Sequence, residues 1–463
     1  MLAWRSRGWP LIHDAPLMHY IAWRISEGAV PYRDLFDMNF PGVYLLHLLA
    51  LKPFGAGDAG WRAFDLAWLA AASLAAAALV APWGRLAAAG AGLFFAAYHL
   101  AAGAWQTGQR DFLVCPFLLL AGLAVARWAE RPDARSSLAW GGLALGAALT
   151  VKPHVGLFAA ALLVLVAVVA RRGGRGVWGP VAIVAAGMAA PALAVVVWLA
   201  VLGALSAWLD IVVHYLLPLY SRLGRPAHWT FYRWQLWIPI MAGATLSLGS
   251  ALASRRFGAR HAVVAIGLGY GVAHFFGQGK GWEYHLYPLA AFAAVALFAE
   301  LPRLLEAGRP AAPALVACIA AAATMLGIKG IEASEPAWIA AKARRVGAVV
   351  AELDGRIAPG DFVQVLDTTE GGIHALLRLS AVEPTRFIYD FHFYHDVETP
   401  MIQRLRREFL ASFDARPPRF VVLFERGWPA GGYERVNGFE GLRQRLSAYR
   451  IDQRGDGYIV YAR

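Results

Sequence analysis

The sequence predicts an all-α polytopic membrane bundle of about ten spans, followed by a small α/β domain. Two observations predict the bundle. The chain of 463 residues is 59% hydrophobic and only 16% charged, and apolar runs of about 17–25 residues recur along it. A third observation predicts the second domain, because the apolar runs end after Lys329 and charged residues return. The predicted parts are a first outer segment at 1–60, a bundle at 61–328 and a soluble domain at 329–463.

The expected spans are ten apolar runs near 61–82, 86–104, 112–129, 136–151, 154–170, 177–203, 235–254, 260–277, 285–301 and 311–328. Every second connection between them is basic, and the arginines concerned are Arg85, Arg127, Arg131, Arg135, Arg171, Arg172, Arg175, Arg255, Arg256, Arg260, Arg303 and Arg309. The positive-inside rule places these connections in the cytoplasm. The connections at 105–111, 152–154, 206–234 and 278–285 then face outward, together with the first segment and the soluble domain.

The apolar run at 41–56 is short for a span and contains His47 and Lys52, so it predicts a juxtamembrane or re-entrant helix. If this run crossed the membrane, Asp14 and Asp111 would lie on opposite sides. Residues 1–13 are too short for a span or a signal peptide that would carry Asp14 outward. We therefore expect the natural reading frame to begin upstream with one more transmembrane helix.

The soluble domain alternates expected helices at 336–355, 396–414 and 438–447 with strand-like runs at 362–366, 386–389, 420–424 and 458–461. This pattern is typical of a small α/β domain. It contains no Walker loop and no GxGxxG before a helix, so no nucleotide-binding signature is present. His392 and His395 have the spacing of two metal ligands, but such a pair is more often part of a surface aromatic patch.

The net charge of +12 does not indicate nucleic-acid binding, because the basic residues gather in short loops between apolar runs. Cys115 and Cys318 both lie inside apolar runs. They are expected to be small buried side chains, which excludes a disulfide framework or a cysteine metal site.

Carboxylates in the first segment are the candidate catalytic groups. Asp14 precedes an amphipathic run, so it is either a helix N-cap or a general base whose basicity is raised near the low-dielectric bundle. Asp37 precedes the Pro41 that opens the next helix, and it is either another cap or an acid of the site. Arg33 is a candidate for substrate binding, although pairing with Asp34 also accounts for it.

Three further outward clusters accompany these acids. Asp111 is expected at the outer end of a span, where a charged side chain is costly unless it is paired or faces a cavity. Cations and tyrosines at an interface can hold a lipid phosphate, although snorkelling and membrane anchoring account for them as well. The substrate-binding candidates in these clusters are Gln109, Arg110, Lys152, His154, Lys280, Glu283, Tyr284 and His285.

The order of these motifs resembles the GT-C glycosyltransferases, in particular the bacterial branch similar to protein O-mannosyltransferases and the lipid A aminoarabinose transferase. The resemblance covers most of the chain. It rests on G-x-x-PYRD, D-x-N-x-PG, GQRDFL, the Lys152–Pro153 pair and K-x-x-x-Y-x-x-Y-P ending at Pro288. The chain departs from the family at Asn39-Phe40-Pro41, where relatives often have Lys-Pro-Pro, and in lacking the usual first transmembrane helix.

The resemblance implies a hexosyl or pentosyl transferase that uses a polyprenyl-phosphate-linked sugar, with Asp14 as the catalytic base and Asp111 and Asp37 as further acids. It implies inversion at the sugar, and a lipid A, polysaccharide or protein acceptor in the cell envelope. Membrane lipids would be the other partners. The expected location is the bacterial inner membrane, with the soluble domain in the periplasm. Three aspartates are compatible with a divalent cation, Mg²⁺ or Mn²⁺, and equally with none.

An alternative function, from a class other than enzymes, is a non-catalytic polyprenyl-lipid transporter or flippase. Transporters tend to place charges mid-span and to show repeated halves, whereas here the polar residues lie at span ends and no internal repeat is found. A structural scaffold is a third alternative, disfavoured by carboxylates at three separate outer positions.

Overall fold

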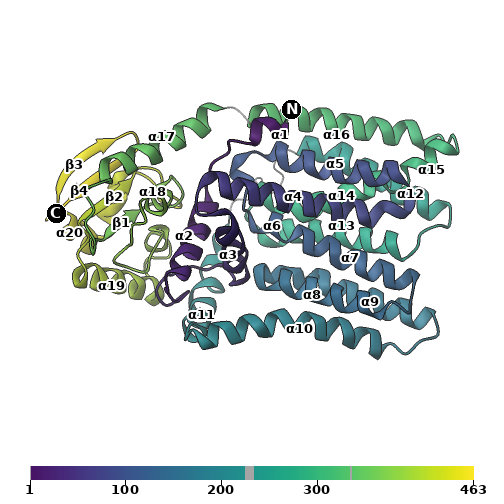
Figure 1. Cartoon of the computed structure of the whole chain (residues 1–463), viewed down its shortest axis with the longest axis horizontal. Coiled ribbons are helices and arrows are strands. Elements are labelled where there is room, and N and C mark those ends of the chain that lie inside the picture. Colours follow the sequence, from purple (N-terminus) through teal and green to yellow (C-terminus); the bar gives the residue numbers. More distant parts are fainter. Residues whose placement is uncertain (1, 225–233, 334–335) are drawn as a thin grey trace.

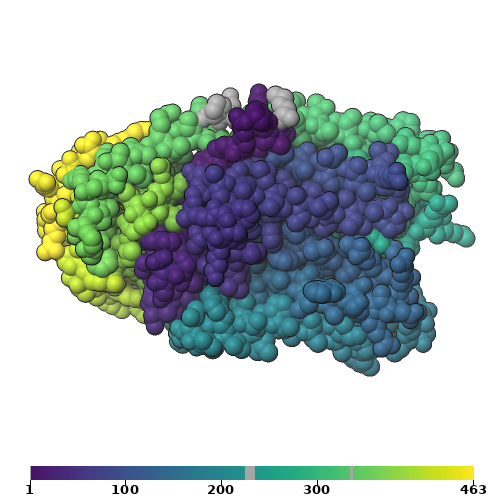
Figure 2. All heavy atoms as spheres, in the orientation of Figure 1, coloured from purple at the N-terminus to yellow at the C-terminus, as the bar shows by residue number. Residues whose placement is uncertain are grey.

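The computed structural model describes residues 2–224, 234–333 and 336–463. Long helices lie side by side in one bundle, an α/β domain packs at one end of it, and the first segment lies between the two (Figure 1). The space-filling view shows the first segment, in purple, filling the space between the green and yellow soluble domain and the blue bundle (Figure 2). Part of the predicted outer connection 206–234 falls outside the described residues.

Each of the ten expected spans corresponds to a helix. These helices are α4 (Asp58–Val80), α5 (Arg85–Ala102), α7 (Cys115–Glu130), α8 (Arg135–Val151), α9 (Gly156–Arg172), α10 (Trp178–Val201), α12 (Trp234–Ala253), α13 (Ala259–Gln278), α14 (Tyr287–Ala299) and α16 (Ala311–Ala333). In the described part of the chain, eight helical stretches are long and apolar enough to cross a membrane. The chain is therefore a multi-pass membrane protein. The spans predicted at α8 and α13 are not among these eight and stay predictions.

Helix α14 is the centre of the bundle, and every one of its residues is buried. Small residues let its neighbours approach, since a Cβ on Gly271 of α13 would lie 2.4 Å from the Leu289 Cα of α14. Close packing of this kind drives helix association where lipid is the solvent. Helix α10 is the opposite case. Only 11% of its most apolar stretch is buried inside the protein, as expected for a helix that faces lipid.

The first segment contains α1 (Leu2–Ser6), α2 (Asp14–Ser26) and α3 (Gly42–Phe54). Helix α3 corresponds to the doubtful run at 41–56. Its 13 residues extend about 20 Å, which is less than the ~30 Å of a hydrocarbon core. It packs against α2, α4 and α8.

The soluble domain contains one four-stranded sheet in the order β1-β2-β4-β3, in which β1 and β2 are parallel and the other neighbours antiparallel. Its elements are α17 (Pro336–Leu353), β1 (Val363–Leu366), α18 (Gly372–Leu379), α19 (Pro400–Ala415), β2 (Phe420–Phe424), α20 (Glu440–Leu446), β3 (Arg450–Gly455) and β4 (Tyr458–Ala462). The sequence did not predict α18 or β3. The second is an edge strand with mostly exposed side chains, so it lacks an apolar alternation.

The strand predicted at 386–389 is wrong. Phe387 forms an isolated bridge with Phe36 of the first segment, and the Phe36 N–H donates to the Arg386 carbonyl at 2.7 Å. The apolar run therefore docks the first segment onto the soluble domain instead of joining the sheet. The Tyr20 hydroxyl supports the same joint by donating to the Ala381 carbonyl at 3.1 Å.

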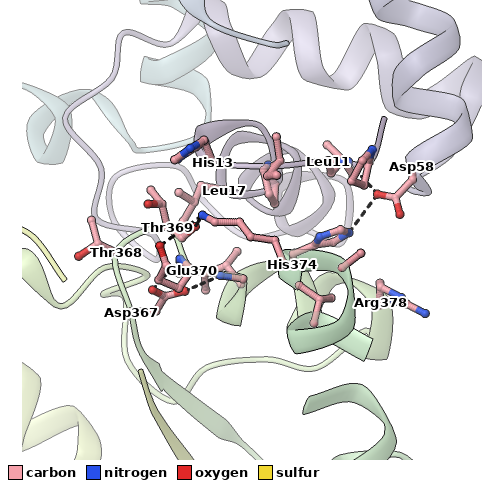
Figure 3. A pocket seen from close by; sticks show the side chains of 18 residues that line it. Leu11, His13, Leu17, Asp58, Asp367, Thr368, Thr369, Glu370, His374 and Arg378 are labelled. Carbon is pink, nitrogen blue, oxygen red and sulfur yellow. Dashed lines mark hydrogen bonds and ion pairs between the residues drawn. The ribbon is translucent and has the colours of Figure 1, made fainter. Parts of the chain in front are cut away.

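A small pocket of about 40 Å³ marks this joint (Figure 3). Asp58, at the start of α4, accepts a hydrogen bond from the Leu11 N–H at 2.8 Å and contacts His374 of α18 at 3.1 Å (Figure 3). A space of this size holds roughly one or two waters. It is therefore a small gap in the contact between the first segment and the soluble domain.

The histidine pair in the soluble domain makes a second joint. The Tyr215 hydroxyl lies 2.6 Å from His392 Nδ1 and 2.9 Å from His395 Nε2. Tyr215 comes from the outer connection after α11 (Leu205–Ile211). The two histidines are thus directed at a hydroxyl, and the described residues contain no group of three or more potential ligands around a metal position.

Candidate active site

A cavity of about 230 Å³, here called the junction cavity, lies where the first segment, the bundle mouth and the soluble domain meet. Aromatic side chains form much of its wall, and a few polar groups converge on it, as is common for small-molecule sites. Its lining residues are His13, Asp14, Met18, Met38, Asn39, Trp105, Gln109, Arg110, Tyr220, Trp282, Tyr284, Thr368, Thr369, Tyr389, Phe391 and Trp428.

Asp14 is the carboxylate of the junction cavity. It is the first residue of α2, while His13 occupies the N-cap position and makes no side-chain cap bond. The alternative of Asp14 as an N-cap is therefore wrong. Its Oδ2 accepts a hydrogen bond from Gln109 Nε2 at 3.2 Å. Burial lowers the pKa of the adjacent His13 to about 3, so that ring is uncharged at neutral pH and does not neutralise the carboxylate.

Arg110 is the cation that lines the junction cavity. It is the first residue of the short helix α6 (Arg110–Leu113). Its guanidinium makes no hydrogen bond or ion pair with another described residue, and Asp14 lies near enough to interact with it electrostatically. An unpaired guanidinium in a largely buried wall is costly, so this position favours an anionic ligand.

Asp111 lies behind the cavity wall and does not line it. Its side chain is fully buried, and its two oxygens contact Lys152 Nζ and His274 Nε2, each at 2.5 Å. Gln278 Nε2 lies 2.8 Å from the same His274 nitrogen, and the rings of His154 and His274 are 5.6 Å apart. These contacts tie the start of α6 to the end of α8 and to α13, and so hold Arg110 in place.

Asp37 is also buried and fully hydrogen-bonded. Its carboxylate accepts hydrogen bonds from the Met38 N–H at 2.8 Å, Asn39 Nδ2 at 2.9 Å and the Tyr44 hydroxyl at 2.6 Å. Burial raises its pKa. The N-cap position of α3 is Pro41, so Asp37 is not a cap for that helix. It orients Asn39, which does line the junction cavity.

Two amide oxygens in the cavity wall lack a hydrogen-bond partner. They are Asn39 Oδ1 and Gln109 Oε1, both buried and without a partner among the described residues. A buried acceptor without a donor costs about 1–3 kcal/mol. Both oxygens are therefore placed to accept hydrogen bonds from a ligand with donor groups.

Lys280 is buried behind Tyr220 and Trp282 of the cavity wall and does not line the cavity itself. Its Nζ donates to the Tyr220 carbonyl at 3.0 Å and lies 4.4 Å from the Tyr220 ring centroid and 5.6 Å from that of Trp282. Burial, together with the charges of Arg110 and Lys152, lowers the pKa of Lys280 to about 8.

The structure therefore brings together Asp14, Gln109, Arg110 and Tyr284 of the predicted site residues. The other eight predicted residues do not line the cavity. Five of them, Asp37, Asp111, Lys152, His154 and Lys280, have been described above, and three remain. Arg33 is exposed and paired with Asp34 at 2.8 Å, Glu283 is paired with Lys329, and His285 is buried with its ring 5.6 Å from that of Trp282.

Sequence reasoning missed every contribution of the soluble domain to the cavity, namely Thr368, Thr369, Tyr389, Phe391 and Trp428. No motif distinguishes these residues, since they come from loops about 350 or more residues away along the chain from Asp14. Asn39 could have been predicted as a site residue. It belongs to the D-x-N-x-PG motif, and its amide can form hydrogen bonds with a ligand.

Two of the three predicted aspartates have no free oxygen to offer a divalent cation. Mg²⁺ is usually held by one or two carboxylates with free oxygens, whereas the oxygens of Asp37 and Asp111 are already bonded to protein donors. No group of three or more His, Cys, Asp or Glu that would hold a metal is found in the ranges that the structure covers.

Structural comparison reveals similar folds among solved proteins. ArnT from Cupriavidus metallidurans bound to undecaprenyl phosphate superposes with a TM-score of 0.66 at 14% identity, covering 99% of this chain and 95% of that chain. Its apo state gives 0.61 at 15% identity, with the same coverage. The chain has the GT-C fold.

A more distant GT-C neighbour is the apo oligosaccharyltransferase of Archaeoglobus fulgidus, with a TM-score of 0.50 at 13% identity, covering 90% of this chain and 66% of that chain. No protein-family model and no curated protein sequence matches the chain. Identities this low establish the GT-C fold, while the activity has to be argued from the residues of the junction cavity.

Proposed function

We propose that the chain is a membrane glycosyltransferase that moves a sugar from a polyprenyl-phosphate carrier to a hydroxyl of a cell-envelope acceptor. The reaction takes place on the periplasmic face of the bacterial inner membrane. The observation that carries the proposal is the meeting of the Asp14 carboxylate and the Arg110 guanidinium in one cavity at the bundle mouth. A fold neighbour, ArnT, has been solved with undecaprenyl phosphate bound, which supports a lipid phosphate as the ligand.

The reaction is a single displacement at the anomeric carbon of the sugar. The acceptor oxygen forms a bond to this carbon while the bond from the carbon to the phosphate oxygen breaks. The electron pair of that bond leaves with the polyprenyl phosphate, and the proton of the acceptor hydroxyl passes to the Asp14 carboxylate. One displacement inverts the anomeric centre. Proton removal by a placed carboxylate contributes about 10²–10⁴-fold to the rate.

The leaving group needs positive charge more than it needs an acid. A phosphate monoester has a second pKa of about 6, so polyprenyl phosphate departs as an anion without being protonated. Arg110 supplies a permanent charge in the cavity wall, and Lys280 supplies a second charge from behind Tyr220 and Trp282 of that wall. Both act on charge that grows in the transition state, where preorganised donors are most effective.

The sugar would be held by the polar groups that lack partners. Asn39 Oδ1 and Gln109 Oε1 accept hydrogen bonds from its hydroxyls, while the rings of Trp105 and Tyr284 cover its apolar faces. Gln109 contacts Asp14 as well. It therefore couples sugar binding to the position of the base.

The test is Asp14→Asn in purified protein in lipid nanodiscs supplied with polyprenyl-phosphate sugars. Transfer should fall by about 10²–10⁴-fold, while the melting temperature stays near the native value because Asp14 is only half-buried. Glu27→Gln is the matched control, since Glu27 is an exposed carboxylate of the same segment. Full transfer by Asp14→Asn would end the assignment of the base. Lipid binding without turnover by the native chain would favour a polyprenyl-lipid transporter.

A further inference from the structure

A second hollow, here called the tail groove, opens on the soluble domain beside the junction cavity. It measures about 690 Å³ and is bounded by the loop that follows β1, at 368–370, and the loop that follows β2, at 425–432. Thr368, Thr369 and Trp428 line both hollows. The tail groove therefore adjoins the cavity that contains Asp14, with these three residues between them.

Buried bonds hold the two loops of the tail groove in place. Arg435 Nη1 donates to the Phe424 carbonyl at the end of β2 at 2.5 Å, and Nη2 donates to the Leu366 carbonyl at the end of β1 at 3.1 Å. Arg435 also forms an ion pair with Asp390 at 2.7 Å, in which each side chain is 1% exposed. These bonds fix the carboxyl ends of the two parallel strands before any ligand binds. Open α/β sheets commonly bind ligands at the carboxyl ends of their strands.

Trp428 stands at the boundary between the two hollows. Its ring centroid lies 6.2 Å from that of Trp282 and 5.8 Å from that of Phe391, and its backbone N–H lies 3.4 Å from Thr368 Oγ1. Aromatic contacts and a loop-to-loop bond therefore hold the half-buried indole at the entrance to the junction cavity.

The outer part of the tail groove is polar. Glu425 and Arg426 are exposed, so a carboxylate and a guanidinium stand next to an indole face. A sugar ring matches this combination, since its C–H face packs on an aromatic ring while its hydroxyls donate to a carboxylate and accept from a guanidinium. An acyl chain would leave both charged groups without partners.

We propose that the tail groove binds a glycan acceptor and delivers the hydroxyl of its terminal sugar to Asp14. The inference rests on the proposed function, and it narrows the acceptor class to carbohydrate that reaches the site from the aqueous side. The polyprenyl donor reaches the same cavity from the bundle. The two substrates therefore approach Asp14 along separate routes, which leaves the acceptor free to attack the face of the sugar opposite the departing phosphate.

The experiment measures transfer of radiolabelled sugar by the full-length protein in nanodiscs. Three acceptor preparations from the cell envelope are compared: the water-soluble glycan fraction, the solvent-extracted lipid fraction and the delipidated protein fraction. Label should enter the glycan fraction. Label that enters only the lipid or only the protein fraction would overturn the proposal.

Variants of the tail groove then locate the binding step. Arg426→Ala should raise the KM for the glycan fraction and leave the KM for the donor unchanged, since Arg426 lines the tail groove and not the junction cavity. Trp428→Ala, which alters the wall that both hollows share, should raise the KM for the glycan fraction about tenfold. Arg407→Ala is the control, because Arg407 is an exposed arginine on α19 of the same domain. Trp428→Phe should recover most of the affinity if the ring is the platform. An unchanged acceptor KM in Arg426→Ala and Trp428→Ala would refute the groove.

Failure of the inference and failure of the proposed function give different results. If the native protein neither transfers nor hydrolyses the donor with any fraction, the proposed function is wrong. If transfer depends on Asp14 but is indifferent to the variants of the tail groove, the glycosyltransferase stands and only the glycan route is refuted.

Discussion

Replacing Lys152 by methionine should destabilise the protein strongly, because it leaves a buried carboxylate without its cation. The Lys152 and Asp111 side chains are 6% and 0% exposed and their charged atoms are 2.5 Å apart. Removing one partner of a buried pair costs about 3–5 kcal/mol. His274 contacts the other oxygen of Asp111 at 2.5 Å and can take up a proton, so we expect the lower half of that range, equivalent to about 10²–10³-fold in the folding equilibrium.

The assay is equilibrium unfolding in mixed detergent micelles, with melting temperature as a second readout. Arg33→Met is the matched control, since its pair with Asp34 is exposed, and it should unfold like the native chain. The double variant Lys152→Met with Asp111→Leu should recover much of the loss, because no charge is then left unpaired. A Lys152→Met variant as stable as Arg33→Met would refute this account of the buried pair.

Three further predictions concern other parts of the molecule. The kcat/KM for the donor should fall as pH rises through about 8, since Lys280 is charged only below the pKa that burial imposes on it; Lys280→Arg should keep activity to higher pH, and an unshifted profile would contradict this. Gly271→Ala should cost about 1–3 kcal/mol, because the added Cβ would meet the Leu289 backbone, whereas Gly269→Ala meets nothing within 4 Å and should be neutral or slightly stabilising in the same unfolding assay. Tyr215→Phe removes the hydroxyl that two buried histidines contact and should cost about 1–3 kcal/mol; native stability in that variant would show that the contacts are unimportant.

The first segment shows how far sequence patterns reach. An acidic residue before an amphipathic run identified Asp14 as a candidate, and the GQRDFL motif identified Gln109 and Arg110. The same reasoning named Asp37 and Asp111 as further acids of the site. The structure distinguishes both from Asp14. Asp37 and Asp111 are buried and bonded to protein donors, whereas Asp14 faces the junction cavity.

The sequence by itself determined the membrane bundle. An apolar run long enough to cross hydrocarbon has to form a helix there, because no water is present to satisfy its backbone groups. The arginines in the connections between spans likewise predict which side of the membrane each connection faces. These properties depend on neighbouring residues, so composition and spacing suffice to predict them.

Only the tertiary structure decided which residues share the junction cavity. Trp428 and Asp14 are separated by most of the chain, and they meet because Phe387 pairs with Phe36 instead of joining the sheet. Such docking depends on shape and on burial of apolar surface between distant segments, for which a single sequence contains no periodic signal. Asp14 and Arg110 were therefore predictable from local motifs, whereas the opposite wall of the cavity became visible only in the folded chain.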